Sequence, residues 1–390
     1  MKPFDEQLKH SLHNLAADVR PDPNDLPVVR RRAVVVRRRA QRMTMVGVVA
    51  SVALVAAAIF ALNYAGRQRA VLPVGPPPSS TSTSSGGLRE VTNPFTVLRT
   101  IQPASLGMSH PLKAAVAPDG HVYITDRDQH VTELTASGAV VRSWGGKGTA
   151  PGQFRLYSGA LAVGPDGRVY VADTGNFRIQ VFTPTGRFLA AYGGYGQGPG
   201  KFVWPSDVVV GPNGDMYVAD DRAATVTALS PDGRQLWRRG APGETDPNLI
   251  GHEHLGGVDA AGQLVTANDD VGEVLYLGSG GRVEDSFSTD QAGADVDASG
   301  ISGGHFPNGA CGATLDPQGN VYVSSCEESY GPKHDTAVYD PEHRLVAGWK
   351  RGVLVDSPVF GSDGHAWAVT SGNQTVVELK VQLPGSRQQP

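Results

Sequence analysis

The sequence lacks the short motifs that mark common catalytic centres. It contains no Gly-x-Ser-x-Gly nucleophile elbow, no phosphate-binding loop and no His-Glu-x-x-His zinc motif. It also has only two cysteines, Cys311 and Cys326, which limits the chain to one internal disulfide. Nothing in the sequence demands catalysis, and binding is therefore the first expectation.

Most of the chain also lacks an excess of basic residues. Residues 94–390 carry 21 Lys and Arg against 32 Asp and Glu, a net charge of −11. Residues 1–93 carry 13 against 6, a net charge of +7, so the whole chain has a net charge of −4. An acidic surface repels phosphate backbones. The sequence therefore predicts no nucleic-acid partner for the large acidic part, and it favours cations, sugars, peptides or proteins.

Residues 43–66, MTMVGVVASVALVAAAIFALNYAG, lack any charged side chain. About 20 apolar residues are enough for a helix to cross a bilayer. A buried core helix and a cleaved signal peptide are the alternatives. The charged leader of 42 residues is long for a signal peptide, and Asn63-Tyr64-Ala65 is a poor cleavage site. The sequence predicts a retained transmembrane helix here, in contact with membrane lipid.

The residues that flank this span predict its orientation. Eight arginines lie between residues 20 and 42, and only Arg67 and Arg69 lie close on the far side. The positive-inside rule puts the N-terminus in the cytoplasm and the rest of the chain outside a plasma membrane that is crossed once. A nucleic-acid-binding arm is the alternative for the basic run, but its place directly against the span favours lipid headgroups.

Three further segments lie outside the folded domain. Residues 1–42 form a cytoplasmic head with apolar residues at helical spacing from Phe4 to Val19. This helix either binds a cytoplasmic partner or lies on the membrane. Residues 67–93 are rich in Pro, Ser and Thr and form a semi-extended stalk. Residues 383–390 form a polar tail.

A repeated unit fills residues 94–382. In each copy a glycine precedes an apolar run, as in PDGHVYITD and PDGRVYVAD, and these glycines are Gly120, Gly167, Gly214, Gly262, Gly319 and Gly364. They are separated by 47, 47, 48, 57 and 45 residues. Four short strands with their turns fill such a period, which is the size of one β-propeller blade. The sequence predicts an all-β fold, a six-bladed β-propeller.

The last copy lacks an outermost strand, whereas an orphan apolar run, Phe95–Ile101, precedes the first copy. A ring closed by this run removes the exposed sheet edges of an open array. We therefore expect Phe95–Ile101 to complete the sixth blade.

These repeats resemble the NHL-repeat family of six-bladed propellers. The likeness is strongest at Val169-Tyr-Val-Ala-Asp173, at Asn176-Phe-Arg178-Ile-Gln-Val-Phe182 and at the Gly-rich GQGPGKF that follows. The family's Asp after the second strand is matched by Asp126, Asp173 and Asp220, whereas Asn268, Ser325 and Thr370 stand there in the later copies. The layout, with one span before the propeller, is similar to the outer part of actinobacterial receptor kinases that bear NHL propellers, although no kinase domain is present.

The two cysteines flank the inner hairpin of the fifth blade. If the loop of this hairpin is Pro317–Asn320, Asp316 pairs with Val321 and Cys311 faces Cys326 across the strands. Direct opposition brings two Cβ atoms within disulfide reach, and an oxidising exterior agrees with a bond. The sequence thus predicts a Cys311–Cys326 disulfide, with two buried thiols as the alternative.

Two groups of side chains are candidates for ligand binding at the propeller mouth. His252 and His254 lie two residues apart at the start of the fourth blade, and His305 leads into the fifth. Three imidazoles with a water molecule make a catalytic zinc site, which peptidyl-α-hydroxyglycine amidating lyase, an NHL-like propeller, exemplifies. Solvated loop histidines are the alternative.

The second group is Asp295-Val-Asp297-Ala-Ser299-Gly300, which has the opening pattern of a calcium-binding loop. Phe306 stands where an EF-hand would require Glu, so an EF-hand is excluded. The ligands expected of this loop are therefore Asp295, Asp297 and Ser299, with calcium as the one candidate cofactor and none required.

The sequence as a whole predicts a membrane-anchored propeller at the cell envelope that senses or docks an extracellular protein, peptide or glycan. The alternative is a metal-dependent lyase or hydrolase with its site at the propeller mouth.

Overall fold

The computed structural model describes residues 94–240, 253–268, 273–289, 310–325, 335–350, 357–370 and 374–383. These residues belong to one compact unit, 90–390. The predicted head, span and stalk lie outside them. Within the part of the chain that is described, no helix has the length and apolar character needed to cross a membrane.

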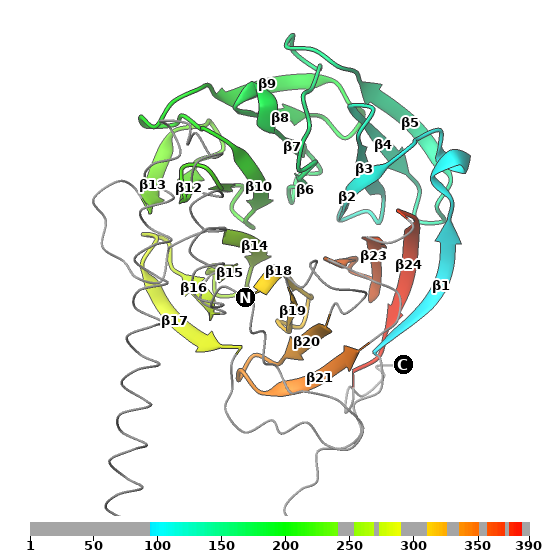
Figure 1. Cartoon of the computed structure of the whole chain (residues 1–390), viewed down its shortest axis with the longest axis vertical. Helices are drawn as coiled ribbons and strands as arrows, with labels where there is room; N and C mark the ends of the chain where they lie inside the picture. The colour runs from blue at the N-terminus through cyan, green and yellow to red at the C-terminus, as the bar shows by residue number, and fades with distance from the viewer. Residues whose placement is uncertain are drawn as a thin grey trace, which may run out of the picture. The chain divides into compact units, whose positions relative to one another are not determined.

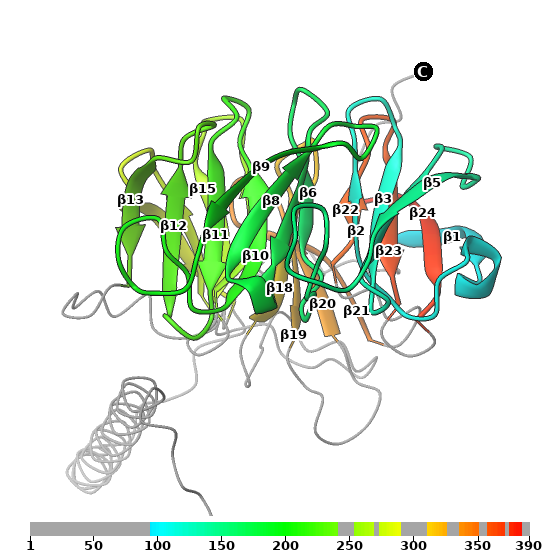
Figure 2. The ribbon, with the colours of Figure 1, turned by 90° about the horizontal axis from the view of Figure 1, so that it is seen from above.

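The described strands form six antiparallel sheets of four strands each, arranged in a ring (Figure 1). Figure 2 shows the ring from the side, with the strands running between two faces that carry the loops and turns. The prediction of a six-bladed propeller is confirmed.

The first three blades follow the chain from the inner to the outer strand. They consist of β2 (Pro111–Val116), β3 (Val122–Asp126), β4 (His130–Leu134) and β5 (Val140–Gly145), then β6 (Leu161–Val163), β7 (Val169–Asp173), β8 (Arg178–Phe182) and β9 (Phe188–Gly193), then β10 (Pro205–Val210), β11 (Met216–Asp220), β12 (Thr225–Leu229) and β13 (Gln235–Arg239). Two 3-10 turns, η1 (Pro103–Leu106) and η2 (Thr174–Asn176), lie before β2 and after β7.

The last three blades are also ordered from the inner to the outer strand, and the outer strand of the sixth blade, β1, comes from the start of the domain. They consist of β14 (Glu253–Val258), β15 (Leu264–Asn268), β16 (Glu273–Leu277) and β17 (Val283–Ser288), then β18 (Ala310–Leu315), β19 (Val321–Ser325), β20 (Asp335–Tyr339) and β21 (Leu345–Lys350), then β22 (Val359–Phe360), β23 (His365–Val369), β24 (Val376–Val381) and β1 (Phe95–Ile101).

The sixth sheet takes its outer strand from the start of the domain. β1 pairs antiparallel with β24, from Phe95 opposite Val381 to Ile101 opposite Val376. The backbone N–H of Gln382 also donates to the carbonyl oxygen of Pro94 at 2.8 Å. The predicted closing strand is therefore confirmed, and the sixth sheet has four strands like the others.

The six repeat glycines all occupy the turn between the first and second strand of a blade. Their φ angles lie between 77° and 84°. Side chains resist this left-handed conformation, whereas glycine adopts it freely. The turn geometry thus explains why the glycine is the clearest repeat signal in the sequence.

The second strands form the core of the blades. All five residues of β3, β7, β11 and β15 are buried, because neighbouring blades cover both faces of each sheet. Aromatic rings pack across the blade boundaries, as where Trp144 of β5 lies 6.0 Å from Phe182 of β8. Close packing of this kind on both faces makes the ring a rigid support for its loops.

The register of the fifth blade differs from the prediction. Val321 pairs with Leu315 and not with Asp316, and an irregularity between Ala310 and Gly312 places Cys311 in a bulge. The predicted direct opposition of the two cysteines is therefore wrong, because the hairpin turn is one residue longer than expected. Cys326 lies outside the described residues, so the disulfide itself stays a prediction.

Candidate functional site

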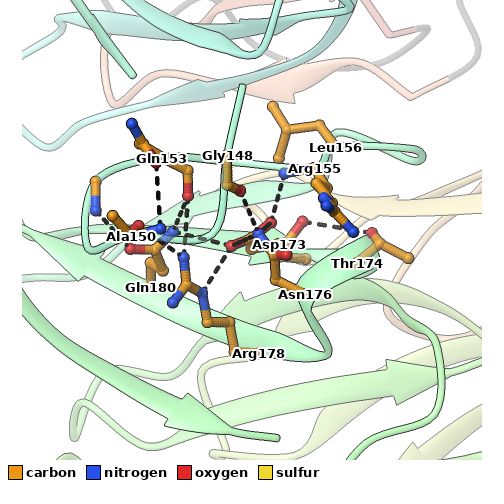
Figure 3. Close-up of polar contacts among 12 residues, drawn as sticks. Gly148, Ala150, Gln153, Arg155, Leu156, Asp173, Thr174, Asn176, Arg178 and Gln180 are labelled. Carbon is orange, nitrogen blue, oxygen red and sulfur yellow. Dashed lines mark hydrogen bonds and ion pairs between the residues drawn. The ribbon is translucent and has the colours of Figure 1, made fainter. Parts of the chain in front are cut away.

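Asp173, the buried aspartate at the end of β7, connects several parts of the second blade (Figure 3). One carboxylate oxygen accepts the backbone N–H of Arg155 at 2.7 Å. The other accepts Arg178 Nε at 2.7 Å and Gln180 Nε2 at 3.0 Å, and Asn176 Nδ2 donates to both. Charge-assisted bonds in a buried place are strong. The network fixes the segment that leads into β6.

Asp220 does the same in the third blade. Its carboxylate accepts the backbone N–H groups of Val203, Trp204 and Ala223 at 2.6, 2.9 and 2.9 Å. Burial raises the pKa of Asp220, although these three hydrogen bonds oppose the shift. The aspartates that carry the family resemblance are thus structural supports for the loops above them.

Those loops form one face of the propeller, which we call the loop face. In the first three blades it consists of residues 102–110, 127–129, 146–160, 174–177, 194–204 and 221–224, which either lead into an inner strand or join the second strand to the third. The opposite turn face consists of the glycine turns between the first and second strands and of the turns between the third and fourth strands.

Aromatic side chains are presented on the loop face. Tyr157 is 62% exposed, and its ring centroid lies 4.8 Å from that of Trp204. The guanidinium carbon of Arg222 lies 4.1 Å from the centre of the Trp204 ring. A second pair, Phe177 and Tyr195, has centroids 5.0 Å apart.

Below this face, the inner strands of all six blades or their approaches line a small cavity in the centre of the ring. The lining residues include one at a corresponding position of each blade, and these six are Lys113, Ala160, Asp207, His254, Gly312 and Ser357. The cavity has a volume of about 110 Å³. We call these six residues the channel ring. Three of them, Lys113, Asp207 and His254, carry ionisable groups.

Asp207 has the most perturbed environment in the channel ring. Burial raises its pKa to about 6, and the charge of Asp221 adds to the rise. The charge of Lys113 and the backbone N–H of Leu255, 3.1 Å from Oδ2, act in the opposite direction. Such a carboxyl changes its protonation close to neutral pH, so it is able to exchange a proton with a ligand.

A larger hollow of about 850 Å³ opens on the turn face. Turns of all six blades line it, including Asp259 and Asp316. His343, which also lines it, stacks on Phe287 with centroids 4.7 Å apart and lies 3.7 Å from Asp285. This end of the channel is therefore acidic, in contrast with the loop face.

The structure describes only part of the predicted site. His254 is at the channel ring, whereas His252 and His305 lie outside the described residues. The same holds for the candidate calcium ligands Asp295, Asp297 and Ser299. Across the described ranges, no three His, Cys, Asp or Glu side chains are grouped so that they could hold a metal ion. The zinc and calcium sites stay predictions.

Sequence reasoning missed Lys113 and Asp207. The signal was present, because positions 113, 160, 207 and 254 follow one another at intervals of 47 residues, the same as the blade period. An ionisable residue at one fixed position of an inner strand that is mostly apolar marks a side chain that faces the channel.

Comparisons with known proteins agree with this architecture. The family model of the NHL repeat matches residues 159–182. No curated protein matches the chain. A streptogramin B lyase structure is similar at 12% identity, with a TM-score of 0.48 and coverage of 74% of this chain and 98% of that one.

Two further solved structures are similar at the same level. Virginiamycin B lyase from Staphylococcus aureus has 11% identity, a TM-score of 0.48 and coverage of 74% and 99%. Hydrazine synthase from Kuenenia stuttgartiensis has 16% identity, a TM-score of 0.46 and coverage of 70% and 77%. At such identities the similarity says nothing of activity. The chain contains an NHL repeat and folds as a six-bladed β-propeller.

Proposed function

We propose that the protein is a membrane-anchored propeller that binds a ligand or a protein partner outside the cell, at the cell envelope. The observation that carries the proposal is the channel ring, in which Lys113, Asp207 and His254 line one cavity. All three residues are half-buried, and removing ionisable groups from water even in part costs free energy that a purely structural inner strand would avoid. Groups kept there at such a cost are typical of a binding site.

The location rests on the sequence. The uncharged run at residues 43–66, with eight arginines between residues 20 and 42, supports a single span with the propeller outside. The stalk of residues 67–93 would then hold the propeller away from the lipid surface.

A metal-dependent lyase or hydrolase is the second candidate. Asp207 favours it, since a carboxyl with a pKa of about 6 suits a general acid or base. His254, which lines the same cavity as Asp207, supplies a second proton-transfer group or a metal ligand. The enzyme would still need a metal with an open coordination position.

Sedimentation with isolated envelope material tests the binding function. The full chain in detergent should co-sediment with the envelope, and the variant with K113A, D207N and H254A together should do so at least tenfold more weakly. The variant with D119N, D166N and D363N, three turn-face changes, serves as the control and should sediment like the wild type. Equal sedimentation of all three proteins would refute a site at the channel ring.

Two further measurements address location and catalysis. In intact cells, protease should digest the propeller but not an epitope at residue 1. Elemental analysis of the purified full chain should find no stoichiometric zinc. Zinc that is present and disappears on replacement of His252 and His254 by Ala would move the function to the enzyme.

A further inference from the structure

Tyr157, Trp204 and Arg222 form a stacked platform on the loop face. Tyr157 is 62% exposed, and its ring centroid lies 4.8 Å from that of Trp204. The guanidinium carbon of Arg222, an exposed residue, lies 4.1 Å from the centre of the Trp204 ring. Two adjacent blades contribute, because Tyr157 precedes β6 while Trp204 precedes β10.

The backbone beneath the platform is held in place. Asp173 binds the N–H of Arg155, two residues before Tyr157, and Asp220 binds the N–H of Trp204 directly. The Tyr157 ring also lies against Gly175, where a Cβ atom would come within 2.6 Å of Cε2. A large aromatic ring that is exposed and yet fixed is preorganised for a ligand, since little further ordering is needed on binding.

The charge around the platform differs from that of the propeller. The loop face of the first three blades, as defined above, carries five exposed cations against two carboxylates, and these are Arg127, Lys147, Arg155, Lys201 and Arg222 against Asp128 and Asp221. Residues 94–390 as a whole have a net charge of −11. A local excess of positive charge on an acidic domain favours an anionic ligand at this place.

We propose that this platform binds an acidic sugar, a uronic-acid unit of a glycan, which deepens the binding function proposed above and rests on it. The negative face of an aromatic ring attracts the C–H hydrogens on the flat side of a pyranose. A guanidinium binds a carboxylate through a pair of parallel hydrogen bonds. The rings of Tyr157 and Trp204 supply the stacking contact with the sugar. The guanidinium of Arg222 supplies the contact with the carboxylate, together with that of Arg155, which lies two residues before Tyr157.

A peptide fits the observations less well. Peptide anchors bury apolar side chains in desolvated pockets, whereas the cavity below the platform is small, about 110 Å³, and the ionisable side chains of Lys113, Asp207 and His254 are among those that line it. Tyr157 and Trp204 each stand three residues before a channel-ring position, roughly 10 Å of extended chain. A glycan that stacks on the platform would extend its hydroxyl groups toward these polar side chains.

Titration of the full chain in detergent with tetragalacturonate, followed by calorimetry, tests the proposal. We expect binding that weakens at high salt and that falls at least tenfold in Tyr157→Ala and in Trp204→Ala. Tyr157→Phe and Trp204→Phe should keep most of it, which separates loss of stacking from loss of folding. Arg222→Gln should lower the affinity for tetragalacturonate but not for the neutral α-1,4-linked galactotetraose.

Tyr195→Ala is the matched control, since Tyr195 is a 65% exposed tyrosine on the same face whose ring pairs with Phe177, whereas the Tyr157 ring pairs with the tryptophan that Arg222 covers. Equal losses in Tyr195→Ala and Tyr157→Ala would overturn the platform, as would binding of tetraglutamate in place of the sugar. If tetragalacturonate does not bind but the full chain still sediments with envelope material, the sugar proposal fails alone. If sedimentation fails too, the binding function fails with it.

Discussion

The ring of Phe95, at the start of β1, lies 5.9 Å from the ring of Tyr322, in the fifth blade. Phe95 is only 8% exposed and belongs to an apolar cluster that also contains Val338 and Leu379. The closing strand therefore holds the sixth blade to the fifth through a side chain, in addition to its backbone pairing with β24.

Replacement of Phe95 by Ala should destabilise the propeller by about 3 kcal/mol, because it leaves a cavity where the closing strand meets the fifth blade. Urea unfolding followed by tryptophan fluorescence measures the change. Leu98→Ala, in the same strand but 46% exposed, is the control and should change stability by less than about 0.5 kcal/mol. A similar effect of both variants would show that the backbone pairing alone closes the ring.

Asp173→Asn should destabilise the protein by about 3 kcal/mol or more, since it removes the charge that compensates the largely buried Arg178. The side-chain amide nitrogen of Asn is also a hydrogen-bond donor, and it would face the N–H donors that bind the carboxylate of Asp173. Asp166→Asn, in an exposed turn where Asp166 pairs with Arg168, is the matched control. Its effect should stay below about 1 kcal/mol, and the difference between the two unfolding midpoints is the measurement.

The stability of the protein should fall as the pH rises through the titration of Asp207. Its pKa is raised to about 6 in the folded state from 3.8, so the folded protein binds a proton more tightly than the unfolded chain between these values. The stabilisation is complete below about pH 4 and is lost by about pH 7, up to about 3 kcal/mol.

Asp207→Asn removes this term, so its stability relative to the wild type should increase from pH 4 to pH 7. Urea unfolding of both proteins at the two pH values gives the difference, in which the titration of all other groups cancels to first order. A difference that stays constant with pH would show that water in the channel keeps the carboxyl at its ordinary pKa.

The Cys311–Cys326 bond requires the bulge at Cys311 to turn one sulfur toward the other, since the strand register does not oppose them. Peptide mapping of the native protein without reductant should find the two cysteines in one linked species. Alkylation of both thiols in the native protein would exclude the bond. A closed loop of about 15 residues contributes at most roughly 3 kcal/mol.

The repeat, the number of blades and the closing strand could be predicted because each depends on a local signal that recurs. The register of the fifth blade could not be predicted, because the sequence is compatible with a hairpin turn of four residues and with one of five. The observed turn is closed by the N–H of Asp316 donating to the carbonyl of Asn320. The side chain of Asp316 also accepts the N–H of Asn320, and this choice is invisible before the fold is known.

The site was predictable only in part. His254 stood out because His252 lies two residues before it, whereas Lys113 and Asp207 belong to the first and third blades and are related only by the 47-residue period of the inner strands. The platform could not be recognised for a similar reason, because Tyr157 and Trp204 belong to different blades. Their separation of 47 residues, one blade period, places them at equivalent positions on one face of the ring.

The hydrogen bond between Gln382 and Pro94 brings the two ends of the domain into contact. A short peptide can therefore join them, and the chain can be opened at another boundary between blades without loss of a strand. Such a circular permutant would carry its first residue beside any chosen blade. A membrane tether or a fluorescent partner could then be attached at different points around the ring, with the loop face turned toward or away from a surface.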